Sequence, residues 1–289
     1  MKKKLISLAV AASAIALVAG TTTTATAATT KTLKVEMIAK GFTHQFWQAV
    51  KKGAQDQAAK MNATVNFVGP AAETMIDQQL QMLDDAIAKK PAAIGYAALG
   101  TTESVSHLAA AHKAGIPVYM FDTAAKCTGA LGPKSSCALG VAFTDSIAAG
   151  KLAADKMGAL LGGTGKVFVI GHTQTNQTGI DRRDGFVNEI KAKFPNINLL
   201  TVQYAEGGDP QKAQDAVAAA LVANSDLKGI YATNEGCSNG AAAALTAAKK
   251  NPGDVKLIGF DSGAQQLANI KSGLETGAIT QNPVGIGAK

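Results

Sequence analysis

The sequence has few of the residues on which most enzymes and metal proteins depend. Its 289 residues include three cysteines, four histidines and one tryptophan. The histidines and cysteines form no pair with metal-ligand spacing. There is no Gly-x-Gly-x-x-Gly after the first predicted strand, no phosphate loop with Gly-Lys-Ser/Thr spacing, and no Gly-x-Ser-x-Gly nucleophile elbow. We therefore expect neither an enzyme nor a bound metal or cofactor.

Arginine is also scarce, since Arg182 and Arg183 are the only arginines among 28 basic residues. The formal net charge is +7, and it falls to +4 without the three lysines near the N-terminus. The remaining lysines are scattered along the chain, whereas nucleic-acid binding needs a clustered basic surface. No nucleic-acid partner is expected.

Residues 1–27 have the layout of a secretory signal peptide. Three lysines at positions 2–4 precede an apolar run over residues 5–19, and Ala25-Thr26-Ala27 offers a small-x-small cleavage site. A transmembrane anchor would need ~20 continuous apolar residues, and serines at positions 7 and 13 interrupt this run. No cysteine for lipid attachment stands near the cleavage site. The pattern predicts export to the periplasm, with cleavage.

The rest of the chain alternates strand and helix patterns with unusual regularity. Strands are predicted over residues 33–38, 64–68, 92–99, 118–122, 139–143, 166–171, 198–204, 229–233, 256–260 and 278–280. Helices are predicted over residues 44–61, 73–89, 103–113, 146–161, 179–193, 210–223, 238–249 and 264–272. This alternation predicts an α/β protein of two doubly wound parallel-sheet lobes. The predicted boundaries are 28–124 for the N-terminal lobe and 125–281 for the C-terminal lobe.

The loop near the predicted lobe boundary carries two of the three cysteines. Cys127 and Cys137 flank a stretch that contains Gly129, Gly132 and Pro133. In an oxidising compartment they could form a disulfide, which would stabilise the fold by roughly 2 to 3 kcal/mol. The remaining Cys237 precedes an Ala-rich helix and is expected to be a small buried residue.

Polar and aromatic residues recur just after the predicted strands. Parallel α/β sheets bind ligands beyond the carboxyl ends of their strands. Aromatic rings offer flat surface to the C–H faces of a sugar, while carboxylates and a guanidinium bind neighbouring hydroxyls in pairs. The candidate ligand-binding residues at these positions are Phe46, Trp47, Asp122, Arg182, Asn234, Asp261 and Gln281.

Each of these candidates also has a purely structural alternative. One of the two adjacent rings, Phe46 or Trp47, would point into the core, because neighbouring helical positions diverge by about 100°. The aspartates could be helix N-caps and Asn234 a turn residue. Arg182 could form a structural salt bridge with Asp181 or Asp184.

Five stretches of the chain resemble the ribose-binding-protein-like periplasmic sugar-binding proteins of ABC importers. They are Phe46 to Ala54, Ala114 to Val118, Arg182 to Phe186, Ala232 to Glu235 and Gly259 to Ser262. They occur in order at family-like spacing and cover nearly the whole mature chain. The resemblance implies a type I periplasmic binding fold, in which two lobes joined by a multi-strand hinge close over a monosaccharide and deliver it to a membrane permease.

The resemblance carries further expectations about the site and its partners. His44 aligns with a polar ligand contact at which an Asn is common. Gln281 falls where the family's chain crosses between lobes, which implies that residues 282–289 return towards the N-terminal lobe. A monomer is expected, with a chemoreceptor as a further candidate partner. Family members usually continue with another helix and strand, so the C-terminal end is expected to be missing after Lys289.

Two other functional classes share this architecture. A secreted glycoside-acting enzyme could use the two strand-end aspartates, but arginine and asparagine beside them would keep both ionised and leave no proton donor. A sugar-responsive regulator core would need a DNA-binding segment, and the sequence begins with an export signal instead.

Overall fold

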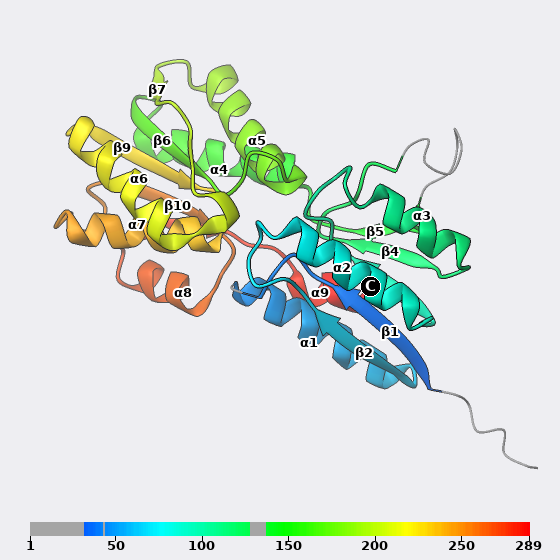
Figure 1. Cartoon of the computed structure of the whole chain (residues 1–289). Coiled ribbons are helices and arrows are strands. Elements are labelled where there is room, and N and C mark those ends of the chain that lie inside the picture. Colours follow the sequence, from blue (N-terminus) through cyan, green and yellow to red (C-terminus); the bar gives the residue numbers. More distant parts are fainter. Residues whose placement is uncertain (1–31, 43, 128–136) are drawn as a thin grey trace, which may run out of the picture. The chain divides into compact units, whose positions relative to one another are not determined.

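The computed structural model describes residues 32–42, 44–127 and 137–289, coloured along the chain in Figure 1. Residues 32–289 make up one compact unit. The predicted signal peptide and the Gly- and Pro-containing loop over residues 128–136 lie outside the described residues. Two parallel sheets organise the described residues.

The first sheet has the strand order β2-β1-β3-β4-β5, and every neighbouring pair is parallel. Its strands are β1 (Leu33–Ile38), β2 (Ala63–Val68), β3 (Ala93–Tyr96), β4 (Val118–Phe121) and β5 (Val141–Ala142). The helices packed with it are α1 (Gln45–Lys60), α2 (Ile76–Ala88), α3 (Val105–Lys113) and α9 (Pro283–Ala288).

Alternating side chains divide the core of the first lobe between the two faces of this sheet. Met37 joins a cluster with α1 and α9, whereas its neighbour Ile38 joins a cluster with α2 and α3. This alternation is what a strand buried on both faces requires. A Cβ on Gly53 of α1 would collide with a backbone carbonyl of α9, so the two helices approach closely where α1 has no side chain.

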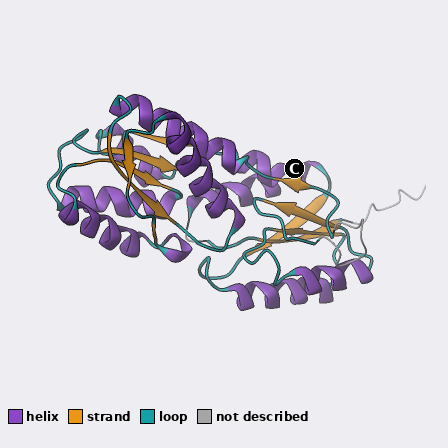
Figure 2. Ribbon diagram, turned by 90° about the horizontal axis from the view of Figure 1, so that it is seen from above, coloured by secondary structure: helices purple, strands orange, loops and turns teal. Residues whose placement is uncertain are grey.

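The second sheet has the order β11-β10-β9-β6-β7, with β8 also paired to β6. Its strands are β6 (Gly165–Gly171), β7 (Ile197–Leu199), β8 (Gln203–Tyr204), β9 (Leu227–Ala232), β10 (Lys256–Phe260) and β11 (Gly277–Ile279). Its helices are α4 (Ser146–Leu161), α5 (Gln177–Lys193), α6 (Pro210–Ala223), α7 (Glu235–Ala247) and α8 (Ala264–Lys271). One core cluster contains α4 and α5 and another contains α6 and α7, and Figure 2 shows the strands between helices.

Strand β5 belongs to the first sheet, although the predicted boundary at residues 124 and 125 places it in the second lobe. Met120 and Phe121 of β4 pair with Val141 and Ala142. The chain returns to the first sheet after the Gly- and Pro-containing loop that suggests the predicted boundary. Because strand pairing is a long-range contact, the local turn signal could not show this.

Most predicted elements are confirmed, and most differences lie at their ends. Helices α4 and α6 have the predicted bounds, while α2 begins at Ile76 instead of residue 73. The single strand predicted over residues 198–204 is wrong, because two short strands, β7 and β8, pair with different parts of β6. A short 3-10 helix, η1 (Glu206–Gly208), and α9 were not predicted.

The three cysteines have two distinct environments. Cys127 and Cys137 are joined by a disulfide and pack in the core cluster that contains α2 and α3. Cys237 is free and buried at the start of α7, and burial raises the pKa of its thiol. Across residues 32–42, 44–127 and 137–289, none of the helices combines the length and apolar character needed to cross a bilayer.

Candidate ligand-binding site

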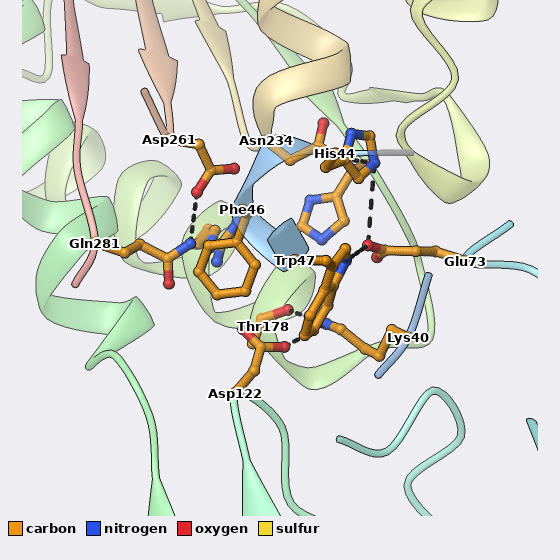
Figure 3. A pocket seen from close by; sticks show the side chains of 12 residues that line it. Lys40, His44, Phe46, Trp47, Glu73, Asp122, Thr178, Asn234, Asp261 and Gln281 are labelled. Atoms are coloured by element: carbon orange, nitrogen blue, oxygen red, sulfur yellow. Dashed lines mark hydrogen bonds and ion pairs between the residues drawn. The ribbon is translucent and has the colours of Figure 1, made fainter. Parts of the chain in front are cut away.

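The carboxyl ends of both sheets contribute side chains to one cavity, shown in Figure 3. The cavity is partly open to solvent, and twelve side chains line it. They are Lys40, His44, Phe46, Trp47, Glu73, Asp122, His172, Thr178, Arg182, Asn234, Asp261 and Gln281. All eight residues predicted to bind ligand are therefore among the lining residues, and the structure adds Lys40, Glu73, His172 and Thr178.

Asp122 follows β4 in a backbone conformation that few side chains adopt. Its φ is 58°, in the left-handed region where a residue other than glycine is uncommon. Its carboxylate accepts from Lys40 Nζ at 2.7 Å and from the Thr123 hydroxyl at 2.9 Å. The side chain binds a buried ammonium at the cavity, so Asp122 is not acting as a helix N-cap.

Lys40 links the first lobe to the second. Its Nζ donates to Asn176 Oδ1 and to Thr178 Oγ1, each at 3.3 Å, at the N-terminus of α5. Sequence reasoning missed Lys40, although it stands just after β1, at the same kind of strand end as Asp122. A lysine after a strand usually reads as a solvated residue, and only the fold shows that this one is buried.

The two adjacent aromatic rings both reach the cavity. Trp47 is 1% exposed and Phe46 is 9% exposed, and the rings meet edge to face with centroids 4.9 Å apart. Both also belong to the core cluster between α1 and the first sheet. The sequence alternative, in which one ring points to the core and the other to the ligand, is too simple because each ring does both.

Glu73 and His44 form the edge of the cavity beside Trp47. Trp47 Nε1 donates to Glu73 Oε1 at 2.7 Å, and His44 Nε2 lies 4.0 Å from the same oxygen. Sequence reasoning placed Glu73 in the first turn of α2, but it lies in the loop before that helix. His44 also contacts Asn234 Nδ2 at 3.4 Å, across the two lobes.

Asp261 is the counterpart of Asp122 in the second lobe. It follows β10 with a φ of 79°, again in the left-handed region. Its carboxylate accepts from Gln281 Nε2 at 2.6 Å and from the backbone N–H of Glu235 at 3.1 Å. Asp261 thus lines the cavity and also accepts from the first N–H of α7, whereas the N-cap of α8, the helix that follows it, is Gly263.

Asn234 and Gln281 also have structural partners. The Asn234 side chain accepts from the backbone N–H of Cys237, as expected of an N-cap of α7, and its amide group faces His44. Gln281 follows β11, and its Oε1 accepts from the Thr144 hydroxyl at 2.8 Å. Gln281 therefore joins the two segments that cross between the sheets.

Arg182 lies on the buried face of α5 and stacks on Phe260, with its guanidinium carbon 3.7 Å from the ring centroid. Its Nη1 donates to the Thr233 carbonyl at 2.9 Å. Its Nε is buried without a hydrogen-bond partner among the described residues. Since an unpaired buried donor is costly, this nitrogen is suited to an acceptor supplied by a ligand. Arg183 instead pairs with Asp184.

His172 completes the second-lobe side of the cavity. Its Nδ1 lies 2.8 Å from the Thr233 hydroxyl. Burial, together with the charges of Arg182, Lys40 and His44, holds the pKa of His172 well below its ordinary value. The imidazole is therefore neutral at physiological pH and can both donate and accept a hydrogen bond. Within residues 32–42, 44–127 and 137–289, no three His, Cys, Asp or Glu side chains are grouped to hold a metal ion.

Comparisons with known proteins agree with this architecture. Residues 35–289 match the family model described as a periplasmic binding protein domain. The D-allose-binding periplasmic protein of Escherichia coli is 30% identical over 256 residues, which cover 87% of this chain and 80% of that protein. A ribose import binding protein of Salmonella typhimurium is 26% identical over 255 residues, which cover 88% of this chain and 81% of that protein.

Solved structures show the same relationship. An ABC transporter solute-binding protein from Agrobacterium vitis with bound D-fucose has a TM-score of 0.82 and 30% identity, covering 88% of this chain and 86% of that chain. A second protein from the same organism, bound to α-D-tagatopyranose, has a TM-score of 0.80 and 31% identity, covering 89% of this chain and 85% of that chain.

The chain belongs to the periplasmic binding protein domain family. The predicted type I fold with two parallel sheets is confirmed. The relatives named above are binding proteins, which agrees with the prediction of a binding protein instead of an enzyme.

Proposed function

We propose that this protein binds one monosaccharide in the cavity between its two lobes and delivers it to the permease of an ABC transporter. Signal peptide cleavage after residue 27 would release the mature protein into the periplasm. The observation that carries the proposal is that residues after six strands of both sheets line one cavity, together with two aromatic rings. The known ligands of the relatives, D-allose, D-fucose and tagatose, favour a sugar as the solute.

The side chains suit the two kinds of surface that a sugar ring presents. Phe46 and Trp47 can pack on the C–H face of the ring, since aromatic side chains bury large areas at low entropic cost. Asp122 and Asp261 approach the rim from opposite lobes and can accept from hydroxyls. Arg182 Nε can donate to a ring or hydroxyl oxygen, which would satisfy a donor that has no partner in the described residues.

The charge balance of the cavity favours a neutral sugar. The acidic and basic side chains largely balance each other, because Lys40 is paired with Asp122. A strongly charged solute would disturb this balance.

Binding and release would follow from movement of the lobes about the segments that join them. An open form would take the sugar on one lobe, and contacts from the other lobe would then favour closure. Micromolar affinity would correspond to about 8 kcal/mol, which an aromatic contact and several charge-assisted hydrogen bonds can supply after ordering costs.

Isothermal titration calorimetry on the mature protein tests this function. The panel should include D-allose, D-ribose, D-fucose, arabinose and tagatose, with a disaccharide as a size control. We expect roughly micromolar affinity for at least one monosaccharide and none for the disaccharide. Absence of heat with every sugar, or turnover of a chromogenic glycoside, would contradict the proposal.

A further inference from the structure

Helices α1 and α8 begin at residues that cannot cap them. The first N–H groups of a helix have no partner inside the helix and are normally satisfied by a Ser, Thr, Asp or Asn side chain at the N-cap. The N-cap of α1 is His44, whose side chain makes no capping bond, and the N-cap of α8 is Gly263, which has no side chain. Both helices therefore depend on acceptors from elsewhere.

Each of these helix N-termini receives its acceptor from the opposite lobe. The backbone N–H of Gln45, the first residue of α1, donates to Glu235 Oε2 at 2.9 Å. The backbone N–H of Ala264, the first residue of α8, donates to Gln45 Oε1 at 2.8 Å. Helix α1 packs on the first sheet and α7 and α8 belong with the second, so both bonds cross between the lobes.

The Glu235 carboxylate occupies the space that a side chain at position 263 would need. A Cβ added to Gly263 would collide with the Glu235 carboxylate. Glu235 is buried and belongs to the first turn of α7, and the N–H of that residue is itself bound by Asp261. The N-termini of α1 and α7 thus each donate to a carboxylate, an arrangement that helix dipoles favour, and the N-terminus of α8 lies beside the Glu235 carboxylate.

We propose that Glu235 and Gln45 form a clasp that caps α1 and α8 only when the lobes are closed, so that part of the driving force for closure comes from the protein itself. This inference rests on the proposed function, in which the lobes open to admit a solute. Neither Glu235 nor Gln45 lines the sugar cavity. The clasp therefore controls how much of the protein is closed without contacting the ligand.

The clasp links affinity to closure in a simple way. When the lobes separate, the first N–H groups of α1 and α8 lose their protein acceptors and are left to water. These bonds raise the fraction of the sugar-free protein that is closed, and the apparent affinity is proportional to that fraction. Removing a clasp bond therefore lowers the apparent affinity by the same factor as the closed population.

The experiment uses Glu235→Ala and Gln45→Ala, which remove the two bonds separately. Gln45→Ala keeps its backbone N–H and hence the bond to Glu235. Glu235→Gln retains an acceptor oxygen and tests whether the charge matters. Gly263→Ala displaces the Glu235 carboxylate while Glu235 and Gln45 themselves remain unchanged. Gly277→Ala is the matched control, because a Cβ there meets no atom within 4 Å.

Three measurements separate the clasp from the site. Small-angle scattering without sugar reports opening, and hydrogen exchange reports protection of the Gln45 and Ala264 amides. Calorimetry then reports sugar affinity. We expect Glu235→Ala, Gln45→Ala and Gly263→Ala each to expand the sugar-free protein, to speed exchange at these amides and to weaken sugar binding roughly fivefold, as for loss of one cap. Gly277→Ala should behave as the unaltered protein.

The outcomes keep the two proposals apart. Unchanged scattering and exchange in Glu235→Ala and Gln45→Ala, with unchanged sugar affinity, would overturn the clasp and leave the binding function intact. If no sugar binds the unaltered protein, the proposed function fails, while scattering and exchange without sugar still decide whether the clasp exists. Should these variants be unfolded by circular dichroism, Gly263→Ala provides the same readouts.

Discussion

The two lobes place an aspartate at the same structural position and stabilise it in different ways. Asp122 and Asp261 each follow a strand, and each has a positive φ of the kind that costs about 1 to 3 kcal/mol and persists where the surroundings hold it. Asp122 is paired with the buried ammonium of Lys40. Asp261 instead accepts from a helix N-terminal N–H and from the Gln281 amide.

This difference indicates which lobe is sensitive to loss of charge. In the first lobe a buried ion pair is stable only while both partners are present, and its cation also contacts the second lobe. In the second lobe neutral donors bind the Asp261 carboxylate, so losing its charge should lower the free energy of unfolding less. The same strand-end geometry therefore has unequal electrostatic support.

Loss of charge at Asp122 should have the largest effect on stability. Asp122→Asn should lower the free energy of unfolding by about 4 kcal/mol, because Lys40 is left buried with only neutral acceptors. Asp261→Asn should cost about 1 kcal/mol, since one acceptor oxygen remains for its donors. Urea denaturation at pH 7 measures both. Equal losses of unfolding free energy in the two variants would show that the Lys40–Asp122 ion pair stabilises the fold no more than the neutral donors of Asp261 do.

A double variant serves as the control for this result. Lys40→Met combined with Asp122→Asn leaves no buried charge, so it should be more stable than Asp122→Asn alone. A double variant that is less stable than the single one would assign the loss to packing instead of charge.

Buried polar groups also differ between the lobes, and this difference predicts a pH effect. In the first lobe the Gln79 amide donates to the carbonyls of Ala39 and Ala97 and accepts from Tyr96 and Leu99. In the second lobe Glu275 is 1% exposed, accepts from Gln266 at 3.3 Å and has one oxygen without a partner among the described residues.

Burial raises the pKa of Glu275 to about 7. In the unfolded chain Glu275 loses its proton near its ordinary pKa of 4.5. The contribution of the protonated Glu275 to folding stability is therefore fully present below pH 4.5 and is lost as the pH rises towards 7. Glu275→Gln cannot ionise, so it should be more stable than the unaltered protein by up to about 3 kcal/mol at pH 8 and equally stable at pH 4. Thermal unfolding across this pH range measures the difference.

Glu103→Gln is the matched control for Glu275→Gln, since Glu103 is exposed and backbone hydrogen bonds lower its pKa. It should give no gain at pH 8. A gain of the same size in both variants would mean that the pH dependence arises from net charge and not from the buried carboxyl.

The sequence predicted the strand ends of the site well because they depend on local signals. A strand of β-branched or apolar residues followed by a polar residue marks the same position in each repeat, and this rule led to Asp122, Asn234 and Asp261. Applied without regard to residue type, it would also have identified Lys40 and His172. These were missed because burial of a charged or titratable residue is a tertiary property.

Long-range contacts explain the other misses. The role of Glu73 depends on a loop that brings it to Trp47, and β5 was assigned to the wrong lobe because its pairing with β4 skips the intervening loop. The capping of α1 by Glu235 joins residues 190 positions apart. No local pattern indicates such a partner, although an N-cap as poor as His44 was a visible sign that one was needed.

The disulfide provides a further, smaller test because it lies only in the first lobe. Cys127→Ser with Cys137→Ser should lower the free energy of unfolding by roughly 2 to 3 kcal/mol, since the bond closes a loop with a sequence separation of 10. Hydrogen exchange should speed in α2 and α3, which share its core cluster. Faster exchange confined to α6 and α7 would contradict this assignment, and Cys237→Ala controls for loss of a thiol.

The smallest effect is expected at the two rings of α1, Phe46 and Trp47, which differ in how far they are buried. Phe46 is the more exposed ring, so Phe46→Leu should weaken sugar binding about tenfold, or about 1.4 kcal/mol, with little loss of stability. Trp47→Leu should reduce both, because it also removes the donor to Glu73 and leaves that carboxylate oxygen buried without it. Calorimetry and urea denaturation on the same samples separate the two effects. Unchanged sugar affinity in Phe46→Leu would leave Trp47 as the sole aromatic surface for the ligand.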